Sequence, residues 1–266
     1  MVTSIPVIEN SLTTPKVRVV SISQPWEWLG AGWKDLWRVP AASIPYGLIF
    51  MVMGYLLVYL VDAQFQYALA LTTGFLLAGP FLAMGLYDLS RRLEAGEPAT
   101  MGRVLMAWRR NPLPILMFGG LIGLLMIVWV RLSAVLFGVI VGGRNLTLDS
   151  SVAQLFFSGS GLIFLLVFVL VGAIIAAAVF AISVVSIPMM LDRKTDFITA
   201  LLTSLTAVRA NPGPMVLWAA LIVIFSGIGL LTFYLGLALV LPLIGHATWH
   251  AYRDLVEDSD LDQQPF

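Results

Sequence analysis

His246 and His250 are the residues with the clearest potential for chemistry in this sequence. They are the only two histidines, and their i, i+4 spacing puts both imidazoles on one face of a helix. Such a pair can begin a metal or haem site, but a complete site needs more ligands, and the nearby Asp254 and Glu257 fall at the aqueous edge. We expect a structural or interfacial role for both histidines and no bound metal or cofactor. Metal or haem binding and proton or partner contacts are the alternatives.

The rest of the sequence offers little that resembles catalytic machinery. Cysteine is absent, which excludes disulfides, thiolate metal sites, iron–sulfur ligation and cysteine nucleophiles. No phosphate-binding glycine loop, dinucleotide fingerprint, His-Glu-x-x-His motif or nucleophile elbow occurs. The long apolar segments carry no Asp, Glu, Lys or Arg in their middles, which disfavours an ion-coupled transporter. We therefore expect a protein that is not an enzyme.

The composition indicates an all-α integral membrane protein. Of 266 residues, 59% are hydrophobic and 11% are charged, and the mean hydropathy is +0.94. A soluble domain carries about 25% charged residues. So little charge cannot coat a water-soluble globule, and lipid must therefore be the solvent for much of the surface. The formal net charge is zero, and we expect no nucleic-acid partner.

The apolar segments predict six transmembrane helices. A span needs about 20 mostly apolar residues. Four segments fit one helix each and a fifth is long enough for two: 43–61, 67–86, 112–130, 161–190 and 214–249. The sequence Ser-Gly-Ile-Gly at 226–229 predicts the turn that divides the fifth. Residues 132–141 are too short to span, and they either extend the third helix or lie at the membrane surface.

The distribution of Lys and Arg predicts the orientation. Thirteen of the 15 basic residues fall in the N-terminal region, in the loops after the second and fourth helices and in the C-terminal tail. Arg131 and Arg144 fall on the other side. Because basic residues concentrate in cytoplasmic loops, we expect both termini in the cytoplasm and the chain in a bacterial inner membrane.

One pattern recurs three times along the chain. Each copy has a short helix-like stretch, a basic residue, a proline and then a span: 33–40, 107–114 and 207–214. Prolines also recur toward the cytoplasmic ends of the even-numbered spans, at Pro80, Pro188 and Pro242, where they would kink a helix. The pattern predicts three repeats, each an interfacial helix followed by two spans.

Tryptophans mark the predicted interfacial helices. After a helix start at 23–25, Trp26, Leu29, Trp33 and Trp37 fall on one stripe. Tryptophan favours the headgroup level because its ring is apolar and its N–H stays hydrated. We expect interfacial anchors, with a partner-binding surface as the alternative, at Trp26, Trp33, Trp37, Trp108 and Trp249.

Three parts of the chain carry a resemblance to known sequences. They are the tryptophan-rich entry at 32–36, Gly79-Pro80-Phe81 together with 85–92, and the segment 245–255. On these residues the chain resembles a bacterial family of predicted integral membrane proteins of unknown function, over roughly residues 20–256. Members sometimes carry the label cytochrome c oxidase subunit I. Two histidines on one helix cannot hold the two haems and copper of an oxidase core, so only an associated or assembly role is compatible with the label.

These observations combine into one prediction. A cytoplasmic tail at 1–22 precedes a single six-helix membrane domain at 23–256 and an acidic polar tail at 257–266. We expect a non-enzymatic protein in the lipid bilayer that binds a membrane-protein partner, as an accessory or assembly factor of a membrane complex, a respiratory one in particular. The alternative is a channel or carrier for a small neutral or amphiphilic solute, formed between the repeats.

Overall fold

Helices make up all of the named secondary structure in this computed structural model, which describes residues 15–60, 65–142 and 157–257. The one strand-like feature in these ranges is an isolated bridge between Val17 and Val256. The predicted all-α class is confirmed. In chain order the elements are α1 (Gln24–Arg38), α2 (Pro40–Leu60), α3 (Phe65–Leu77), α4 (Gly79–Leu82), α5 (Met84–Glu94), α6 (Met101–Val104), η1 (Ala107–Arg110), α7 (Pro112–Phe137), η2 (Gly138–Gly142), α9 (Gly159–Ser183), α10 (Ser186–Asp192), α11 (Phe197–Ala210), α12 (Pro212–Leu231) and α13 (Leu237–Leu255).

Four helical segments of the described chain are long and apolar enough to cross a membrane. They are Pro40–Leu57, Pro112–Gly142, Gly159–Asp192 and Pro212–Leu231. In the second and third, only 17% of the apolar window is buried inside the protein, so most of their side chains need an apolar solvent outside it. The prediction of membrane-spanning helices is confirmed for these four.

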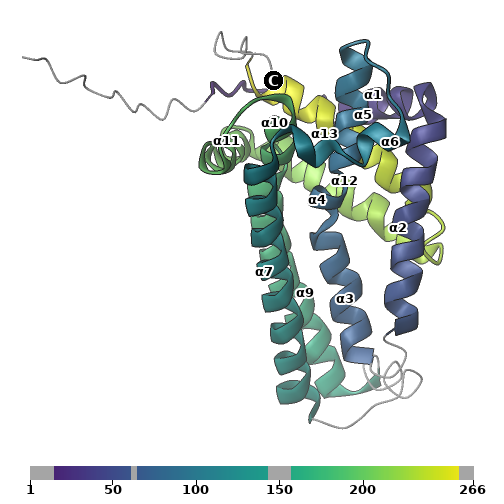
Figure 1. The fold of residues 1–266 in the computed structure, drawn as a ribbon. Helices are drawn as coiled ribbons and strands as arrows, with labels where there is room; N and C mark the ends of the chain where they lie inside the picture. Colours follow the sequence, from purple (N-terminus) through teal and green to yellow (C-terminus); the bar gives the residue numbers. More distant parts are fainter. Residues whose placement is uncertain (1–14, 61–64, 143–156, 258–266) are drawn as a thin grey trace, which may run out of the picture.

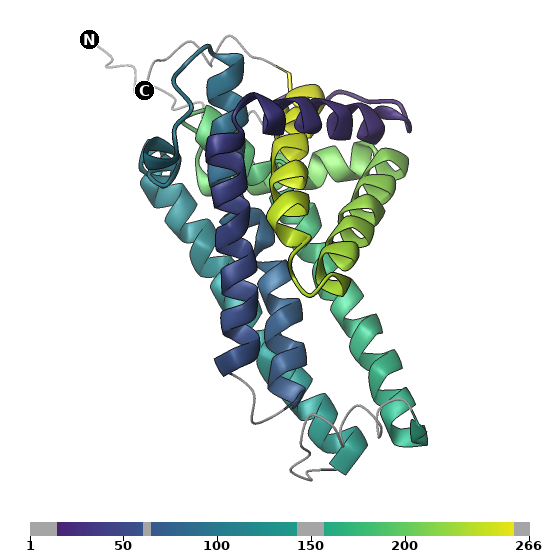
Figure 2. The same cartoon turned by 90° about the vertical axis from the view of Figure 1, so that its right-hand side faces the viewer.

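The long helices project from one crowded end of the molecule. Figures 1 and 2 show α2, α3, α7 and α9 extending away from the end where α1, α5, α6, α10 and α11 gather. We call that end the head. Its core contains the largest buried side chains outside the α7–α9 contact, among them Trp28, Trp249 and Tyr252. A smaller cluster around Trp129 and Phe164 joins α7 to α9.

Proline begins three of the long helices. Pro40, Pro112 and Pro212 are the first residues of α2, α7 and α12, and each directly follows a helical segment of the head. Proline suits this position because the first helical N–H groups have no partner within the helix. Two other prolines mark breaks: α3 ends just before Pro80 and α9 before Pro188, while α13 continues through Pro242.

The predicted turn at 226–229 is wrong. The helix α12 runs to Leu231, and the chain reverses at 232–236, where Phe233 and Tyr234 have φ angles of 53° and 64°. A Cβ at Gly229 would lie 2.5 Å from a methyl carbon of Leu237 and 3.2 Å from its backbone nitrogen. The glycine therefore allows α12 and α13 to approach closely, and it does not bend the chain.

Residues 132–141 extend the third helix. The helix α7 continues to Phe137 and passes into the π-helical η2, so the end predicted near residue 130 is too early. Part of the tail predicted at 1–22 is held against the protein. From residue 15 onward it is bound to the end of α13, with the Arg18 N–H donating to the Leu255 carbonyl at 2.8 Å. The remainder of both predicted tails lies outside the described residues.

Small residues set how closely α1 lies on α13. A Cβ added to Gly32 of α1 would stand 2.6 Å from the backbone nitrogen of Ala247 and 2.9 Å from its Cβ. The backbones at this crossing are too close for any other residue. Gly30 lies on the same helix, and its added Cβ would meet nothing within 4 Å.

We expect Gly32→Ala to destabilise the head by about 1–3 kcal/mol, because the methyl group must push α1 off α13. Gly30→Ala is the matched control, since it gains the same helix propensity and meets no neighbour. Thermal unfolding of the detergent-purified proteins, followed by tryptophan fluorescence, measures the difference. Equal melting temperatures for the two variants would contradict the close crossing.

Candidate functional site

A buried hydrogen-bonded network joins four helices in the head. We call it the His–Asp network; it consists of Asp35 in α1, Ser43 in α2, Ser90 in α5, and His246 and His250 in α13. The Asp35 carboxylate oxygen Oδ2 lies 2.8 Å from Ser90 Oγ and 2.8 Å from His250 Nε2. His246 lies 2.7 Å from Ser90 Oγ through Nδ1 and 2.9 Å from Ser43 Oγ through Nε2. The sequence predicted the two histidines, and the structure adds their three partners.

The proton positions in the network follow from its geometry. Ser90 has one hydroxyl hydrogen, which it donates to the Asp35 carboxylate. It must therefore accept from His246, which fixes the proton on Nδ1. The other ring nitrogen, Nε2, then accepts from the Ser43 hydroxyl. Every polar side-chain atom in this series of hydrogen bonds has a partner, as burial requires.

Asp35 is the charged centre of the network. Its side chain is buried, and burial by itself would raise the pKa of the carboxyl group. Hydrogen bonds from His250 and Ser90, together with the two imidazoles, outweigh burial and lower the pKa below its ordinary value of 3.8. The carboxylate is therefore ionised at neutral pH, and it holds α5 and α13 against α1.

The arrangement does not resemble a metal centre. Both ring nitrogens of His246 are occupied by serine hydroxyls, and His250 is turned toward Asp35. Within the described ranges, no group of three or more His, Asp or Glu side chains is placed to hold a metal ion. In the structure the two histidines are hydrogen-bonding positions on one helix face.

His250 connects the network to the surface. Its side chain is 29% exposed, and it lines an open cavity of about 450 Å³ between α1 and α13. Asp254 closes one side of this cavity and accepts hydrogen bonds from Trp28 Nε1 at 2.7 Å and Gln24 Nε2 at 2.9 Å. The other lining residues are Glu27, Gly30, Ala31 and Lys34.

Two further polar groups lie in the head, one local to α5 and the segment after it and one that joins α10 to α13. Asp88 accepts from Arg91 Nε at 2.9 Å and from Arg92 Nε at 2.7 Å, and both guanidinium groups also reach Glu97. In the second group, Tyr252 donates to Asp192 Oδ2 at 2.7 Å and accepts from Arg193 Nε at 2.7 Å. The basic residues at the helix ends are thus internal connections of the head as well as surface charges.

Trp249 differs from the predicted interfacial anchors. Its side chain is only 1% exposed, and its indole N–H donates to Glu94 Oε2 at 2.9 Å. The ring also packs against Tyr252 with centroids 5.4 Å apart. The prediction is wrong for this residue because the polar N–H that would suit a lipid headgroup is satisfied by a carboxylate of α5. Trp108 is partly exposed, with the Arg109 guanidinium 5.5 Å from its ring.

Helix α1 has three distinct faces. The stripe that contains Trp28, Leu29 and Leu36 is buried against the protein. Trp26, Trp33 and Trp37 are 56%, 44% and 51% exposed, roughly 120° around the helix from the buried stripe. Glu27, Lys34 and Arg38 occupy the third face. Leu29 therefore does not share the face of the three tryptophans, although its spacing suggested that it would.

Comparison with known proteins agrees with the presence of membrane-spanning helices. Residues 67–192 match the family described as predicted integral membrane protein (DUF2189). The predicted resemblance to a membrane family of unknown function is confirmed over that range, which is narrower than the one the sequence suggested. No curated protein and no solved structure matches the chain. The DUF2189 range covers α3 through α10 and includes Ser90, while the other four residues of the His–Asp network lie outside it.

The sequence contained a signal for Asp35 that the histidine spacing did not provide. Asp35 falls three residues after Gly32 and seven after Trp28, on the same face of α1 as these buried residues. A carboxylate on a buried face must find donors. The serines Ser43 and Ser90 gave no such signal, because serine is common in apolar helices as a donor to its own backbone.

We expect Asp35→Asn to lower the stability of the protein by about 1–3 kcal/mol, because Ser90, His250 and, at 3.5 Å, Arg38 converge on the carboxylate that the variant lacks. Glu27→Gln, an exposed carboxylate on the same helix, should change it by less than about 0.5 kcal/mol. Because folding lowers the Asp35 pKa, its contribution is complete above pH 3.8 and is lost as the pH falls through the lower folded value. Denaturation measured against pH should show this acid loss in the wild type and not in Asp35→Asn. Identical acid profiles would contradict the assignment.

Proposed function

We propose that the chain has six spans. Four are the apolar segments described above, and the other two are the helical run α3–α5 and α13. From 65 to 94 the chain is helical except for short breaks at Ala78 and Ala83. The 19 residues of α13 extend about 28 Å, close to the thickness of the hydrocarbon core. The last turns of α13 are more polar than the other apolar segments because they carry His246, His250 and Arg253.

The proposed orientation places the head in the cytoplasm of a bacterium. Apart from Arg131 in α7, the Lys and Arg residues of the described chain belong to the head or to the segments that join it: Lys16, Arg18, Lys34, Arg38, Arg91, Arg92, Arg103, Arg109, Arg110, Arg193, Lys194, Arg209 and Arg253. Cytoplasmic flanks carry this excess of positive charge. The arrangement supports cytoplasmic termini and an inner-membrane location.

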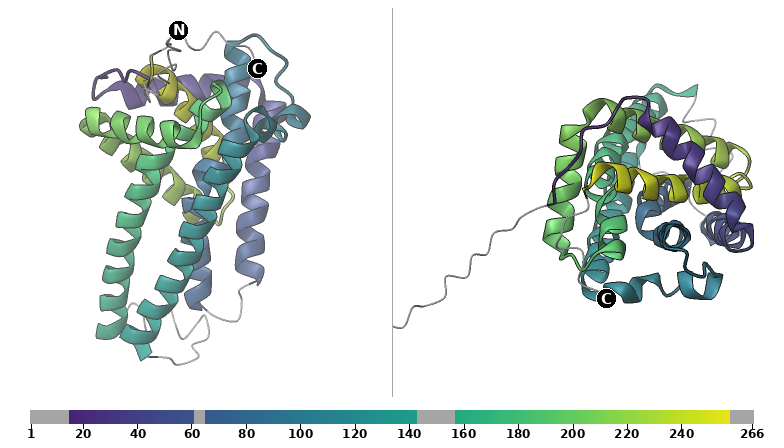
Figure 3. Two further views of the ribbon diagram at one scale, coloured as in Figure 1. Left: turned by 60° about the vertical axis from the view of Figure 1, so that its left-hand side comes forward. Right: turned by 90° about the horizontal axis from the view of Figure 1, so that it is seen from above.

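Three repeats are also proposed. The helical segments that precede Pro40, Pro112 and Pro212 are α1, η1 and α11, and each leads directly into a long helix. Seen from above, α1, α6 and α11 lie around the periphery while α13 lies near the centre (Figure 3). The copies are unequal, because the second contains only the short α6 and η1.

We infer that the protein works through contacts, as an accessory or assembly factor of a membrane complex. The observation that carries this inference is the aromatic face of α1, formed by Trp26, Trp33 and Trp37. The opposite side of α1 is fixed to α13 by Asp35 and by the close approach at Gly32, so the three rings are presented on a rigid helix. Rigid, exposed tryptophans are typical of interface anchors and of headgroup-level helices.

The alternative of a channel or carrier receives less support. It predicts a polar cavity lined by all three repeats. The cavity at His250 is lined by α1 and α13 alone, and a second open space, beside α7, is lined by α3 and α7. The described apolar segments also lack the charged pairs that usually mark ion pathways.

The topology can be tested by cysteine labelling, since the natural sequence has no cysteine. With a membrane-impermeant maleimide on intact cells, Leu235→Cys in the α12–α13 turn should label from outside and Gly102→Cys in α6 should not. Disrupted cells should label both. Labelling of Gly102→Cys on intact cells would contradict six spans with the head in the cytoplasm. So would labelling of Leu235→Cys only after the cells are disrupted.

The partner hypothesis predicts that a tagged protein, purified in mild detergent from its own membranes, carries a second membrane protein in fixed proportion. Trp33→Ala/Trp37→Ala should lower that yield several-fold, because aromatic anchors carry much of an interface. Lys34→Ala, an exposed residue on the adjacent face, is the control. Mass spectrometry of the eluates measures the ratio of the second protein to the tagged one. Recovery of the tagged protein alone would contradict the accessory role.

A further inference from the structure

Arg131 is a charge in an otherwise apolar helix. Apart from Asp192 at the end of α10, it is the only charged residue in the four candidate spans. It lies nineteen residues after Pro112, and α7 rises about 1.5 Å per residue, which places it about 28 Å along the helix from the head. A hydrocarbon core is about 30 Å thick. Arg131 therefore lies near the membrane surface opposite the head.

The guanidinium group of Arg131 has no partner within the part of the chain that the structure describes. Its side chain is exposed, and neither a hydrogen bond nor an ion pair reaches it there. A guanidinium presents five donors and stays charged at any physiological pH. At this depth the acceptors outside the protein are lipid phosphates and interfacial water.

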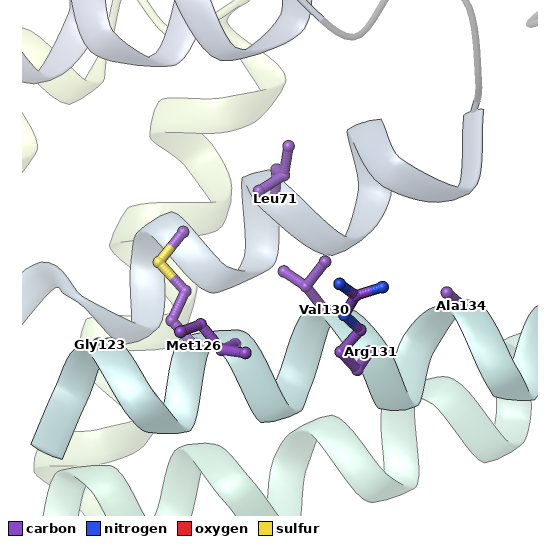
Figure 4. A pocket seen from close by; sticks show the side chains of 7 residues that line it. Leu71, Gly123, Met126, Val130, Arg131 and Ala134 are labelled. Carbon is purple, nitrogen blue, oxygen red and sulfur yellow. The ribbon is translucent and has the colours of Figure 1, made fainter.

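An open, mostly apolar groove of about 450 Å³ lies between α3 and α7, lined on α7 from Gly123 to Ala134, with Arg131 near one end. Figure 4 shows Met126, Val130 and Arg131 rising from α7 toward α3, the helix that carries Leu71. The remaining lining residues are Gly123, Ile127 and Ala134. The groove is therefore charged at one end and apolar along its length.

We propose that this groove binds one glycerophospholipid of the leaflet opposite the head. The phosphodiester accepts hydrogen bonds from the Arg131 guanidinium, and one acyl chain occupies the groove as far as Gly123. Only a molecule that joins an anion to a long apolar chain satisfies both ends of the site. Free phosphate would leave the groove empty, and an uncharged chain would leave the guanidinium unpaired.

Two substitutions test the two ends of the site separately. Arg131→Gln removes the charge and the paired donors. Gly123→Leu places a side chain in the groove at a position where an added Cβ would meet nothing within 4 Å. Gly120→Leu is the matched control, since Gly120 lies one turn away on the same helix, is equally open and does not line the groove.

The measurement is native mass spectrometry of the delipidated full-length protein titrated with phosphatidylglycerol. We expect one tightly bound lipid, weakened on the order of tenfold by Arg131→Gln and by Gly123→Leu and unchanged by Gly120→Leu. Unaltered affinity in Arg131→Gln, or in Gly123→Leu, would overturn the proposal. Displacement of the lipid by inorganic phosphate alone would also overturn it, because the site would then recognise an anion and not a phospholipid.

Discussion

The head depends on the buried carboxylate of Asp35. Removing a carboxylate from water costs several kcal/mol unless donors replace the lost hydration. Those donors are Ser90 and His250, on two different helices, together with Arg38 of α1 itself at 3.5 Å. Ser90 in turn fixes the ring of His246. The carboxylate is therefore satisfied only when α1, α5 and α13 are all in place, and Ser43 adds α2. A single buried charge makes the assembly of four helices cooperative.

Much of the fold follows from the sequence because its causes are local. An apolar run of about 20 residues is enough to indicate a span, and proline before such a run is enough to indicate its start. The failures have non-local causes. Gly229 suggested a turn, yet its role is to admit Leu237 from the next helix. A glycine in an apolar segment indicates either a reversal or a close approach, and only the neighbouring helix decides between them.

The candidate site was predictable only in part, for a similar reason. The spacing of His246 and His250 places them on one face of a helix, but it says nothing about what that face meets. Asp35 was detectable as a charge on the buried stripe of α1, whereas Ser43 resembles any other serine near a helix start. Trp249 shows the opposite error. Its residue type suggested lipid, while a carboxylate on another helix, Glu94, supplies the acceptor that its indole N–H requires.

The two ends of the molecule use their polar groups differently, and this difference bears on function. In the head, the carboxylates of Asp35, Asp88 and Asp192 bond to arginines, histidines and hydroxyls of the protein itself. On α1 the head exposes a charged face and an aromatic face, and the aromatic one is the kind of surface that binds a headgroup layer or another protein. At the opposite end, Arg131 is exposed and has no internal partner among the described residues. The proposed protein partner therefore rests on the aromatic face of α1, and the proposed lipid on the groove beside Arg131.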